Sequence, residues 1–231
     1  MKEELHRYSL IVGENAINKL NKSHVAIFGV GGVGGAAVIA LARAGIGEIS
    51  VFDFDVVEKS NINRQVVANQ LTIGESKVEV IRNLIKEINP VIKVNVHNMF
   101  VNADNYLNIN WDEFDFVIDA LDNVSAKLLI IKQCSENNVR VISAMGAGNR
   151  LDPSKLEICD IFKTSHDPLA KVMRYELRKL GIKSLPVAFS KEVGAVFEKG
   201  HQNVVGSSPF VPNAMGLLLA SYVASELIKG L

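Results

Sequence analysis

The sequence is poor in cysteine and has no excess of charge of either sign. Two cysteines occur among 231 residues, Cys134 and Cys159, too few for a disulfide framework or for a zinc site of four cysteines. Lysine plus arginine and aspartate plus glutamate both number 25, so the net charge gives no sign of a polyanionic partner. The composition is 48% hydrophobic and 22% charged, as in ordinary globular proteins, and it excludes a disordered or fibrous chain.

Long hydrophobic runs are also missing. The longest apolar stretch, between Ala214 and Ile228, is interrupted by Ser221, Ser225 and Glu226, which argues against a membrane span. The first residues are charged and lack the apolar segment of a signal peptide. We therefore expect a cytoplasmic protein with no membrane partner.

Strands and helices alternate over the first 150 residues. Apolar runs at 24–30 and 48–54 predict buried strands, and the small residues of 32–44 predict a helix that ends at Gly45. Later patterns predict helices and further strands at 75–88, 94–100, 114–121, 125–137 and 139–143. This alternation predicts an α/β, Rossmann-like fold, with a mostly parallel sheet and helices on both faces.

The pattern changes near residue 150, which suggests a core (1–150) and a mixed C-terminal extension (151–231) packed on the same domain. In the extension we expect strands at 156–162 and 185–189, a basic helix at 168–180 and a final helix at 213–228. Residues 191–208 are rich in glycine, serine and charge, which predicts a mobile loop.

A glycine-rich turn joins the first predicted strand to the first predicted helix. Residues 29–34 read Gly-Val-Gly-Gly-Val-Gly, and Asp53 lies 19 residues beyond Gly34. Glycines allow the backbone to approach a phosphate, the helix N-terminus offers unpaired N–H groups, and the acid can accept ribose hydroxyls. A turn that only packs the helix is the alternative. The combination favours a nucleotide site that includes Gly29, Gly31, Gly32, Gly34 and Asp53.

The segment after Asp53 indicates which nucleotide fits. Residues 53–65 read Asp-Phe-Asp-Val-Val-Glu-Lys-Ser-Asn-Ile-Asn-Arg-Gln, and Lys77 follows 13 residues after Arg64. Two such cations can clamp a triphosphate, although each alone could be a solvated loop charge. Asp122 follows the fourth predicted strand, where a carboxylate can share Mg²⁺ with phosphates. Together these residues predict a nucleoside triphosphate bound with Mg²⁺.

In this order the motifs resemble the adenylyltransferase superfamily of the ubiquitin-activating enzymes and the molybdopterin and thiamine pathway enzymes. The resemblance covers about residues 5–150. It implies that a carboxylate attacks the α-phosphate of ATP, that Asp122 holds the metal, and that Arg7 reaches the partner's triphosphate in a homodimer. The residues it implies at the nucleotide are Asp53, Asp55, Ser60, Asn61, Asn63, Arg64, Lys77, Asp122 and Asn123, of which Arg64, Lys77 and Asp122, together with Arg7, are expected to be catalytic.

The second half of the chain indicates which branch of this superfamily the sequence resembles. Sulfur-carrier-activating members have two Cys-x-x-Cys pairs, which this chain lacks, and we expect Cys134 and Cys159 to be buried, inert thiols. Residues 143–153 and 160–170 instead resemble the tRNA threonylcarbamoyladenosine dehydratase branch. That branch implies activation of the threonine carboxylate on a modified adenosine beside the anticodon, then ring closure with release of AMP.

Charge is unevenly distributed along the chain. Seven lysines and arginines against two acids lie between 163 and 191, whereas 101–122 holds six acids and no lysine or arginine. A basic face fits a phosphate backbone, although a solvated helix with scattered charge is the simpler alternative. The residues expected to contact tRNA are Lys163, Lys171, Arg174 and Arg178.

Other functions use the same motifs. Activation of a small carrier protein's C-terminal carboxylate needs the same nucleotide site. A nucleotide-binding module without turnover would not need the cation clamp, and a nicotinamide-dependent oxidoreductase is the alternative at the level of fold alone. The sequence does not identify the tRNAs, any sulfur-transfer partner or any monovalent ion.

Overall fold

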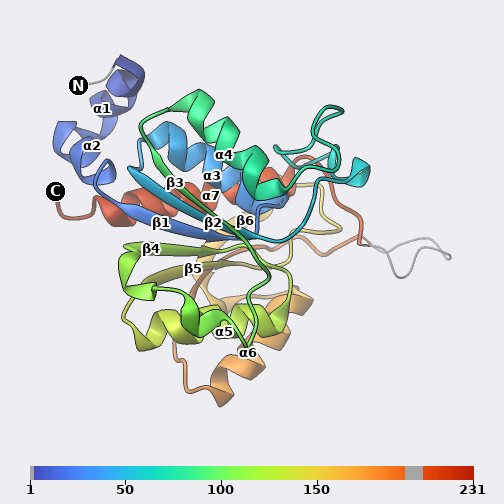
Figure 1. The fold of residues 1–231 in the computed structure, drawn as a ribbon. Coiled ribbons are helices and arrows are strands. Elements are labelled where there is room, and N and C mark those ends of the chain that lie inside the picture. The colour runs from blue at the N-terminus through green and yellow to red at the C-terminus, as the bar shows by residue number, and fades with distance from the viewer. Residues whose placement is uncertain (1–2, 196–204) are drawn as a thin grey trace.

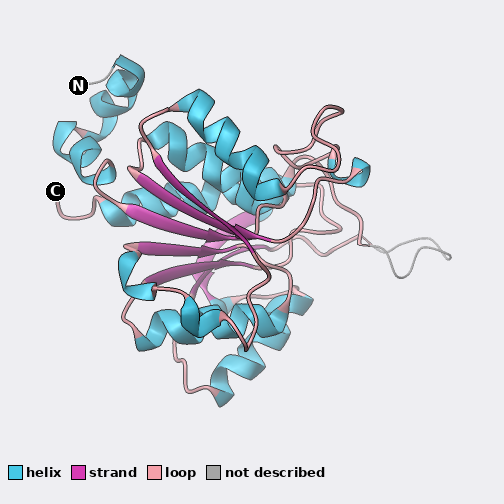
Figure 2. Cartoon of the chain, viewed as in Figure 1, coloured by secondary structure: helices cyan, strands magenta, loops and turns pink. Residues whose placement is uncertain are grey.

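The computed structural model describes residues 3–195 and 205–231, and these form one seven-stranded sheet in the order β3-β2-β1-β4-β5-β7-β6. Helices α3, α4 and α7 cover one face and α5 and α6 the other (Figures 1 and 2). The predicted α/β fold with a mostly parallel sheet is confirmed. The strands are β1 (His24–Phe28), β2 (Glu48–Asp53), β3 (Lys93–Asn98), β4 (Phe116–Asp119), β5 (Arg140–Ala144), β6 (Leu156–Asp160) and β7 (Pro186–Ser190).

From β1 to β5 the α-helices of the described residues separate successive strands, except that two 3₁₀ helices and no α-helix lie between β3 and β4. The α-helices of the described residues are α1 (His6–Val12), α2 (Glu14–Leu20), α3 (Gly32–Ala44), α4 (Lys77–Ile88), α5 (Val124–Glu136), α6 (Pro168–Lys179) and α7 (Val211–Leu227). The extension contributes to the same sheet, because β7 pairs in parallel with β5, and β6 then pairs antiparallel with β7.

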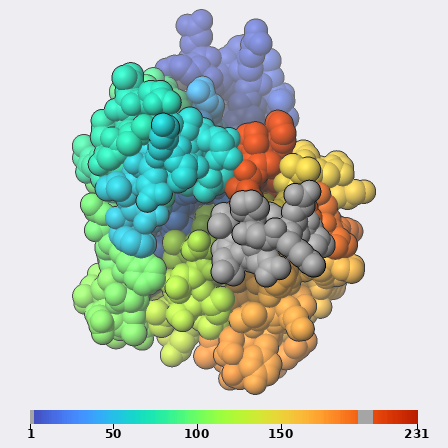
Figure 3. Space-filling view, turned by 90° about the vertical axis from the view of Figure 1, so that its right-hand side faces the viewer, coloured from blue at the N-terminus to red at the C-terminus, as the bar shows by residue number. Residues whose placement is uncertain are grey.

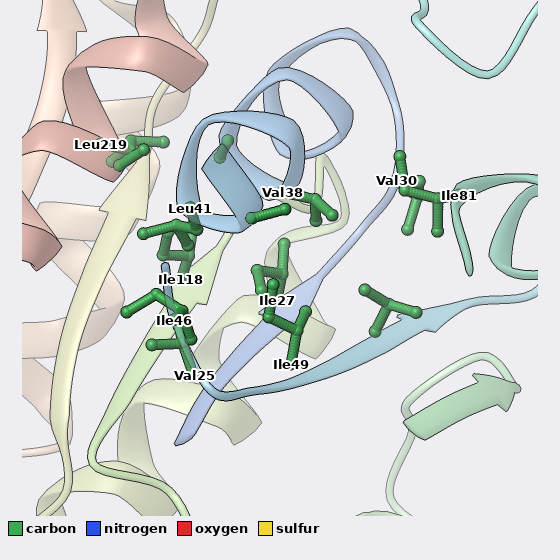
Figure 4. Packing of buried hydrophobic residues seen from close by; sticks show 14 of the residues in the cluster. Val25, Ile27, Val30, Val38, Leu41, Ile46, Ile49, Ile81, Ile118 and Leu219 are labelled. Atoms are coloured by element: carbon green, nitrogen blue, oxygen red, sulfur yellow. The ribbon is translucent and has the colours of Figure 1, made fainter. Parts of the chain in front are cut away.

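The core lies between the sheet and its helices. Ile27 of β1 and Ile49 of β2 pack with Val38 and Leu41 of α3, and all four side chains are fully buried (Figure 4). Burying such a side chain contributes about 1.5–3 kcal/mol. Strands covered on both faces have no solvated side, which is why the sequence of β1 reads as a continuous apolar run.

Several boundaries differ from those predicted. Strand β1 ends at Phe28, because Gly29 turns the chain with a φ of 92°. The strand predicted at 156–162 ends at Asp160, whose carboxylate caps a 3₁₀ helix, Ile161–Lys163, by accepting the N–H of Phe162. Helices α1 and α2 were not predicted. The loop predicted at 191–208 includes residues 196–204, which lie outside the described part of the chain.

Helix α7 crosses α3 at very short range. A Cβ built on Gly216 would lie 2.2 Å from the carbonyl oxygen of Val33 and 2.8 Å from the Cβ of Ala36. One built on Gly32 would lie 3.1 Å from the Cβ of Pro212. The start of α7 therefore packs against the first turn of α3, where the glycine-rich loop ends.

Helices α1 and α2 lie at the amino edge of the sheet (Figure 1). The N–H of Gly47, just before β2, donates to the carbonyl oxygen of Leu20 at 3.1 Å. On the outer side of α1, Leu10 and Ile11 are 73% and 82% exposed. No helix within residues 3–195 and 205–231 has the length and apolarity that crossing a bilayer requires.

Candidate functional site

A cavity of about 510 Å³ opens at the carboxyl edge of the sheet. The glycine-rich loop, the ends of β2 and β4, and residues 146–148 after β5 contribute to its lining. Figure 3 looks onto this edge, with the segment that follows β2 (cyan) and α6 (orange) at opposite sides of the view. Ligands of open α/β sheets bind at this edge, so the cavity is the candidate site.

The glycines of the loop have different surroundings. Gly29, Gly31 and Gly32 line the cavity, whereas Gly34 does not. A Cβ on Gly34 would lie only 1.8 Å from the carbonyl oxygen of Gly29, while one on Gly31 would meet nothing nearer than Gln65 Nε2 at 3.9 Å. Gly34 therefore allows the helix to pack on the loop, and Gly31 leaves space on the cavity side.

Asp53 connects the end of β2 to the glycine-rich loop. Its Oδ2 accepts the N–H of Val30 at 2.6 Å, and its Oδ1 accepts the N–H of Asp55 at 2.9 Å. These bonds fix the carboxylate at the cavity wall, where its remaining lone pairs can accept hydroxyl groups. This arrangement suits a ribose.

Two cations line the same cavity. The buried Lys77, at the start of α4, places Nζ 2.7 Å from Asp55 Oδ2. Half-buried Arg64 donates from Nη1 to the carbonyl oxygen of Ser60 at 3.0 Å and to Asn63 Oδ1 at 2.8 Å. Side chains held in this way lose little further freedom when an anion binds, which favours a phosphate site.

Asp122 is exposed at the cavity wall, after the end of β4. Its neighbour Asn123 caps α5, with Oδ1 accepting the N–H of Ala126 at 3.0 Å. No cluster of three or more acidic, histidine or cysteine side chains suited to a metal occurs in the described residues. Mg²⁺ usually takes only one or two carboxylates together with waters and substrate phosphates, so this donor set fits an ion shared with ATP.

Not every predicted residue reaches the cavity. Ser60 and Asn63 do not line it, because Ser60 Oγ donates to Glu58 Oε2 and Asn63 Nδ2 donates to the carbonyl oxygen of Ser207. Asn61 does line it, but its Oδ1 accepts the N–H of Glu58. Arg7 lies on α1 at the opposite edge of the sheet.

Two further features of the site were not predicted from the sequence. Gln65 lines the cavity, and its buried Oε1 has no partner among the described residues, as a group awaiting a ligand would. Residues 146–148 line the β5 side. Their Gly-Ala-Gly sequence, which begins three residues after the predicted strand 139–143, was the available signal, since glycine-rich turns can bring the backbone close to ligands.

The basic residues predicted to contact tRNA are not equivalent. Lys163, Lys171 and Arg178 are exposed, and the guanidinium of Arg178 lies 5.1 Å from the ring centre of Phe162. Arg174 is half-buried and donates from Nη1 to Thr164, both to Oγ1 and to the carbonyl oxygen. Its guanidinium is thus partly engaged within the protein.

Neither cysteine lines the cavity. Cys134 is fully buried, and burial, with a smaller contribution from the Asp119 charge, raises the pKa of its thiol far above the usual range. Cys159 is only half-buried, so the prediction of a buried thiol was wrong there: β6 lies at the edge of the sheet. Partial burial and the neighbouring Glu157 and Asp160 still raise the pKa of Cys159, which keeps the thiol protonated.

Comparison with known proteins places these features in a family. A model of the ThiF family matches residues 4–157. The chain is 37% identical to the tRNA threonylcarbamoyladenosine dehydratase of Bacillus subtilis, over 97% of this chain and 96% of that protein. It is 38% identical to the enzyme of the same name from Escherichia coli, over 73% of this chain and 63% of that protein.

The fold agrees with a solved structure. The tRNA N6-threonylcarbamoyladenosine dehydratase TcdA of E. coli, in complex with ATP, superposes with a TM-score of 0.91 at 32% identity. The match covers 98% of this chain and 94% of that one. It therefore includes the extension after residue 150 as well as the nucleotide-binding part.

Proposed function

The chain belongs to the ThiF family, and from this premise we propose that it is an ATP-dependent tRNA threonylcarbamoyladenosine dehydratase. The observation that carries the proposal is the likeness to dehydratases along nearly the whole chain, including residues beyond 150. Because the substrate is a tRNA, we infer a cytoplasmic reaction. Because β5 and β7 pair across residue 150, we infer that the core and the extension act as one domain.

The residues of the cavity suit the chemistry of adenylation. A carboxylate oxygen of the threonine moiety attacks the α-phosphorus of ATP, and pyrophosphate leaves. Asp53 binds the ribose, while Arg64 and Lys77 stabilise the negative charge that develops on the phosphates. Mg²⁺ held by Asp122 and phosphate oxygens would add to that stabilisation. An atom of the carbamoyl group on the same nucleoside then attacks the activated carbonyl carbon, and AMP leaves.

The direct test is the product. We expect that incubation with ATP, Mg²⁺ and tRNA carrying threonylcarbamoyladenosine, then digestion and mass spectrometry, gives a nucleoside lighter by one water. An unchanged nucleoside with ATP bound would contradict the proposal. The variants Cys134→Ala and Cys159→Ala should retain this activity. Its loss in a folded, ATP-binding cysteine variant would favour activation of a carrier protein instead.

We infer that the enzyme is a homodimer in which Arg7 completes the partner's site. Arg7 lies at the edge of the sheet opposite its own cavity, and its helix α1 exposes Leu10 and Ile11, an apolar surface suited to a protein contact. The family resemblance gives the same role to this arginine.

Mixing two inactive variants should restore activity. In a dimer of one Arg7→Ala and one Asp122→Ala subunit, one site keeps its own Asp122 and receives an intact Arg7. Random exchange should then recover about a quarter of wild-type turnover, because half of the dimers are mixed and each has one complete site. As a control, mixing Arg64→Ala with Asp122→Ala should recover none. A monomer in sedimentation at assay concentration would exclude this arrangement.

The exposed basic residues of α6 are expected to contact tRNA phosphates. Replacing Lys171 and Arg178 together with glutamine should weaken tRNA binding and reduce its salt dependence by about one unit of slope per lost contact. The affinity for ATP should stay the same. The matched pair Lys19→Gln and Lys22→Gln, exposed near α2, should leave the slope unchanged. Equal slopes in both double variants would remove α6 from the tRNA-binding surface.

A further inference from the structure

The order of the strands indicates the side from which the substrate arrives. Asp53 is the last residue of β2, the glycine-rich loop follows β1 and Asp122 follows β4, and these three strands are neighbours in the sheet. The nucleotide therefore occupies their carboxyl ends. The next strand is β5, and the cavity extends along the wall formed by residues 146–148, which we call the β5 wall and where the substrate carboxylate can meet the α-phosphate.

A buried ion pair fixes the β5 wall. Arg150 and Asp167 are 4% and 3% exposed, with Arg150 Nη2 at 3.6 Å from Asp167 Oδ2. Asp167 Oδ2 accepts the N–H of Gly146 at 2.9 Å. Arg150 Nη1 donates to the carbonyl oxygens of Gly146 and Gly148. The pair thus holds the N–H and the carbonyl group of Gly146 at the same time.

The same carboxylate also holds helix α6. Asp167 Oδ1 accepts the N–H of Ala170 at 3.0 Å and caps the helix, whose Leu169 lines the cavity. A Cβ on Gly146 would lie 3.3 Å from Arg150 Nη1 and from both carboxylate oxygens of Asp167. The β5 wall, the ion pair and the start of α6 are therefore packed as one unit.

A contribution to folding stability does not by itself account for this buried ion pair. Burying two charges costs desolvation free energy that their attraction often fails to repay, so a buried ion pair is better suited to fixing one arrangement of the chain. The N–H groups of Ala147 and Gly148 have no acceptor among the described residues. Backbone donors of this kind can stabilise a carboxylate or a developing oxyanion when they are held in place.

We propose that Arg150 and Asp167 are positioning residues for the substrate. They hold the β5 wall so that its backbone N–H groups bind the carboxyl group of the tRNA nucleoside, and they link that wall to α6, where the tRNA backbone docks. The inference rests on the proposed function and adds the side from which the nucleoside is held. It follows that the ion pair affects whether the adenylate undergoes ring closure or hydrolysis, and has little effect on the affinity for ATP.

The fate of the adenylate provides the test. Ring closure releases one AMP for each cyclic nucleoside, whereas attack by water restores the carboxylate and releases AMP without product. In Asp167→Asn the carboxylate, which accepts hydrogen bonds from two backbone N–H groups, becomes an amide whose NH₂ group cannot accept one of them. Arg150→Lys keeps the positive charge but loses the planar guanidinium group with its several donors. We expect the cyclic nucleoside formed per AMP to fall by about tenfold to a hundredfold in both variants. The Kd for ATP should stay close to that of the wild type.

Two further variants separate positioning from stability. Gly146→Ala pushes on the pair without removing a charge, and should lower the same ratio. Ile92→Ala opens space in the core at the amino end of β3; it should lower the Tm but leave one AMP per product. The proposal is overturned if Arg150→Lys and Asp167→Asn form as much cyclic nucleoside per AMP as the wild type. A parallel decrease of AMP and cyclic nucleoside, which leaves that ratio unchanged, overturns it as well. Wild-type protein that binds ATP but forms no cyclic nucleoside would instead refute the proposed function, and this inference with it.

Discussion

Replacing Asp122, Lys77 or Arg64 with alanine is expected to lower kcat for AMP formation by about 10²–10³-fold, the usual effect of losing one group that stabilises transition-state charge. All three side chains line one cavity, although they come from three segments of the chain. Each variant should still fold. Asp122 is exposed, and the Asp55 carboxylate that loses its partner in Lys77→Ala is itself only half-buried.

The control for this prediction is Lys59→Ala. Lys59 is an exposed cation five residues before Arg64 that does not line the cavity. Its variant should keep near-normal turnover with saturating ATP, Mg²⁺ and tRNA, and thermal unfolding should show all four proteins folded. Near-normal kcat in any of the three cavity variants would remove that residue from the site.

The second large effect is expected at two glycines only three residues apart. In Gly34→Ala the new Cβ would meet the Gly29 carbonyl oxygen at 1.8 Å, so the loop and α3 cannot keep their packing. Although alanine is the better helix former by about 1 kcal/mol, we expect a net loss of more than about 4 kcal/mol and little folded protein.

Gly31→Ala should behave in the opposite way. Its Cβ would have open space beside Gln65, and its φ of −78° is accessible to alanine. We expect the variant to unfold within a few degrees of the wild-type Tm but to bind ATP more weakly, because the methyl group faces the cavity. Calorimetric titration and thermal unfolding of both variants measure the contrast. A folded Gly34→Ala that binds ATP normally would contradict the packing argument.

Local patterns predicted the parts of the site that lie on single strand-to-helix turns. The glycine-rich loop with Asp53, and Asp122 after β4, follow from the rule that parallel strands end at one edge, and the structure groups them there. Within the next loop the order of residues was a poorer guide. Ser60 and Asn63 bond to Glu58 and Ser207, because loop side chains are directed by backbone turns that spacing does not reveal.

Features that depend on distant contacts could not be predicted. Arg150 and Asp167 lie 17 residues apart and meet only because β6 folds back between them to pair with β7. Nothing in either residue's neighbourhood marks it as buried. Helices α1 and α2 are seven residues each, too short for a clear apolar period, and they are stabilised by tertiary contacts.

The close crossing of α7 over α3 has a genetic consequence. Gly216 is far along the sequence from the glycine-rich loop, yet a methyl group there would push on the Val33 carbonyl at the first turn of α3. In a screen of random mutations for loss of activity, substitutions of Gly216 should therefore be as damaging as substitutions of the nucleotide-binding residues. Because the clash is with backbone, such alleles should lack single-residue suppressors. Ala36→Gly would relieve the 2.8 Å contact but leave the one at 2.2 Å.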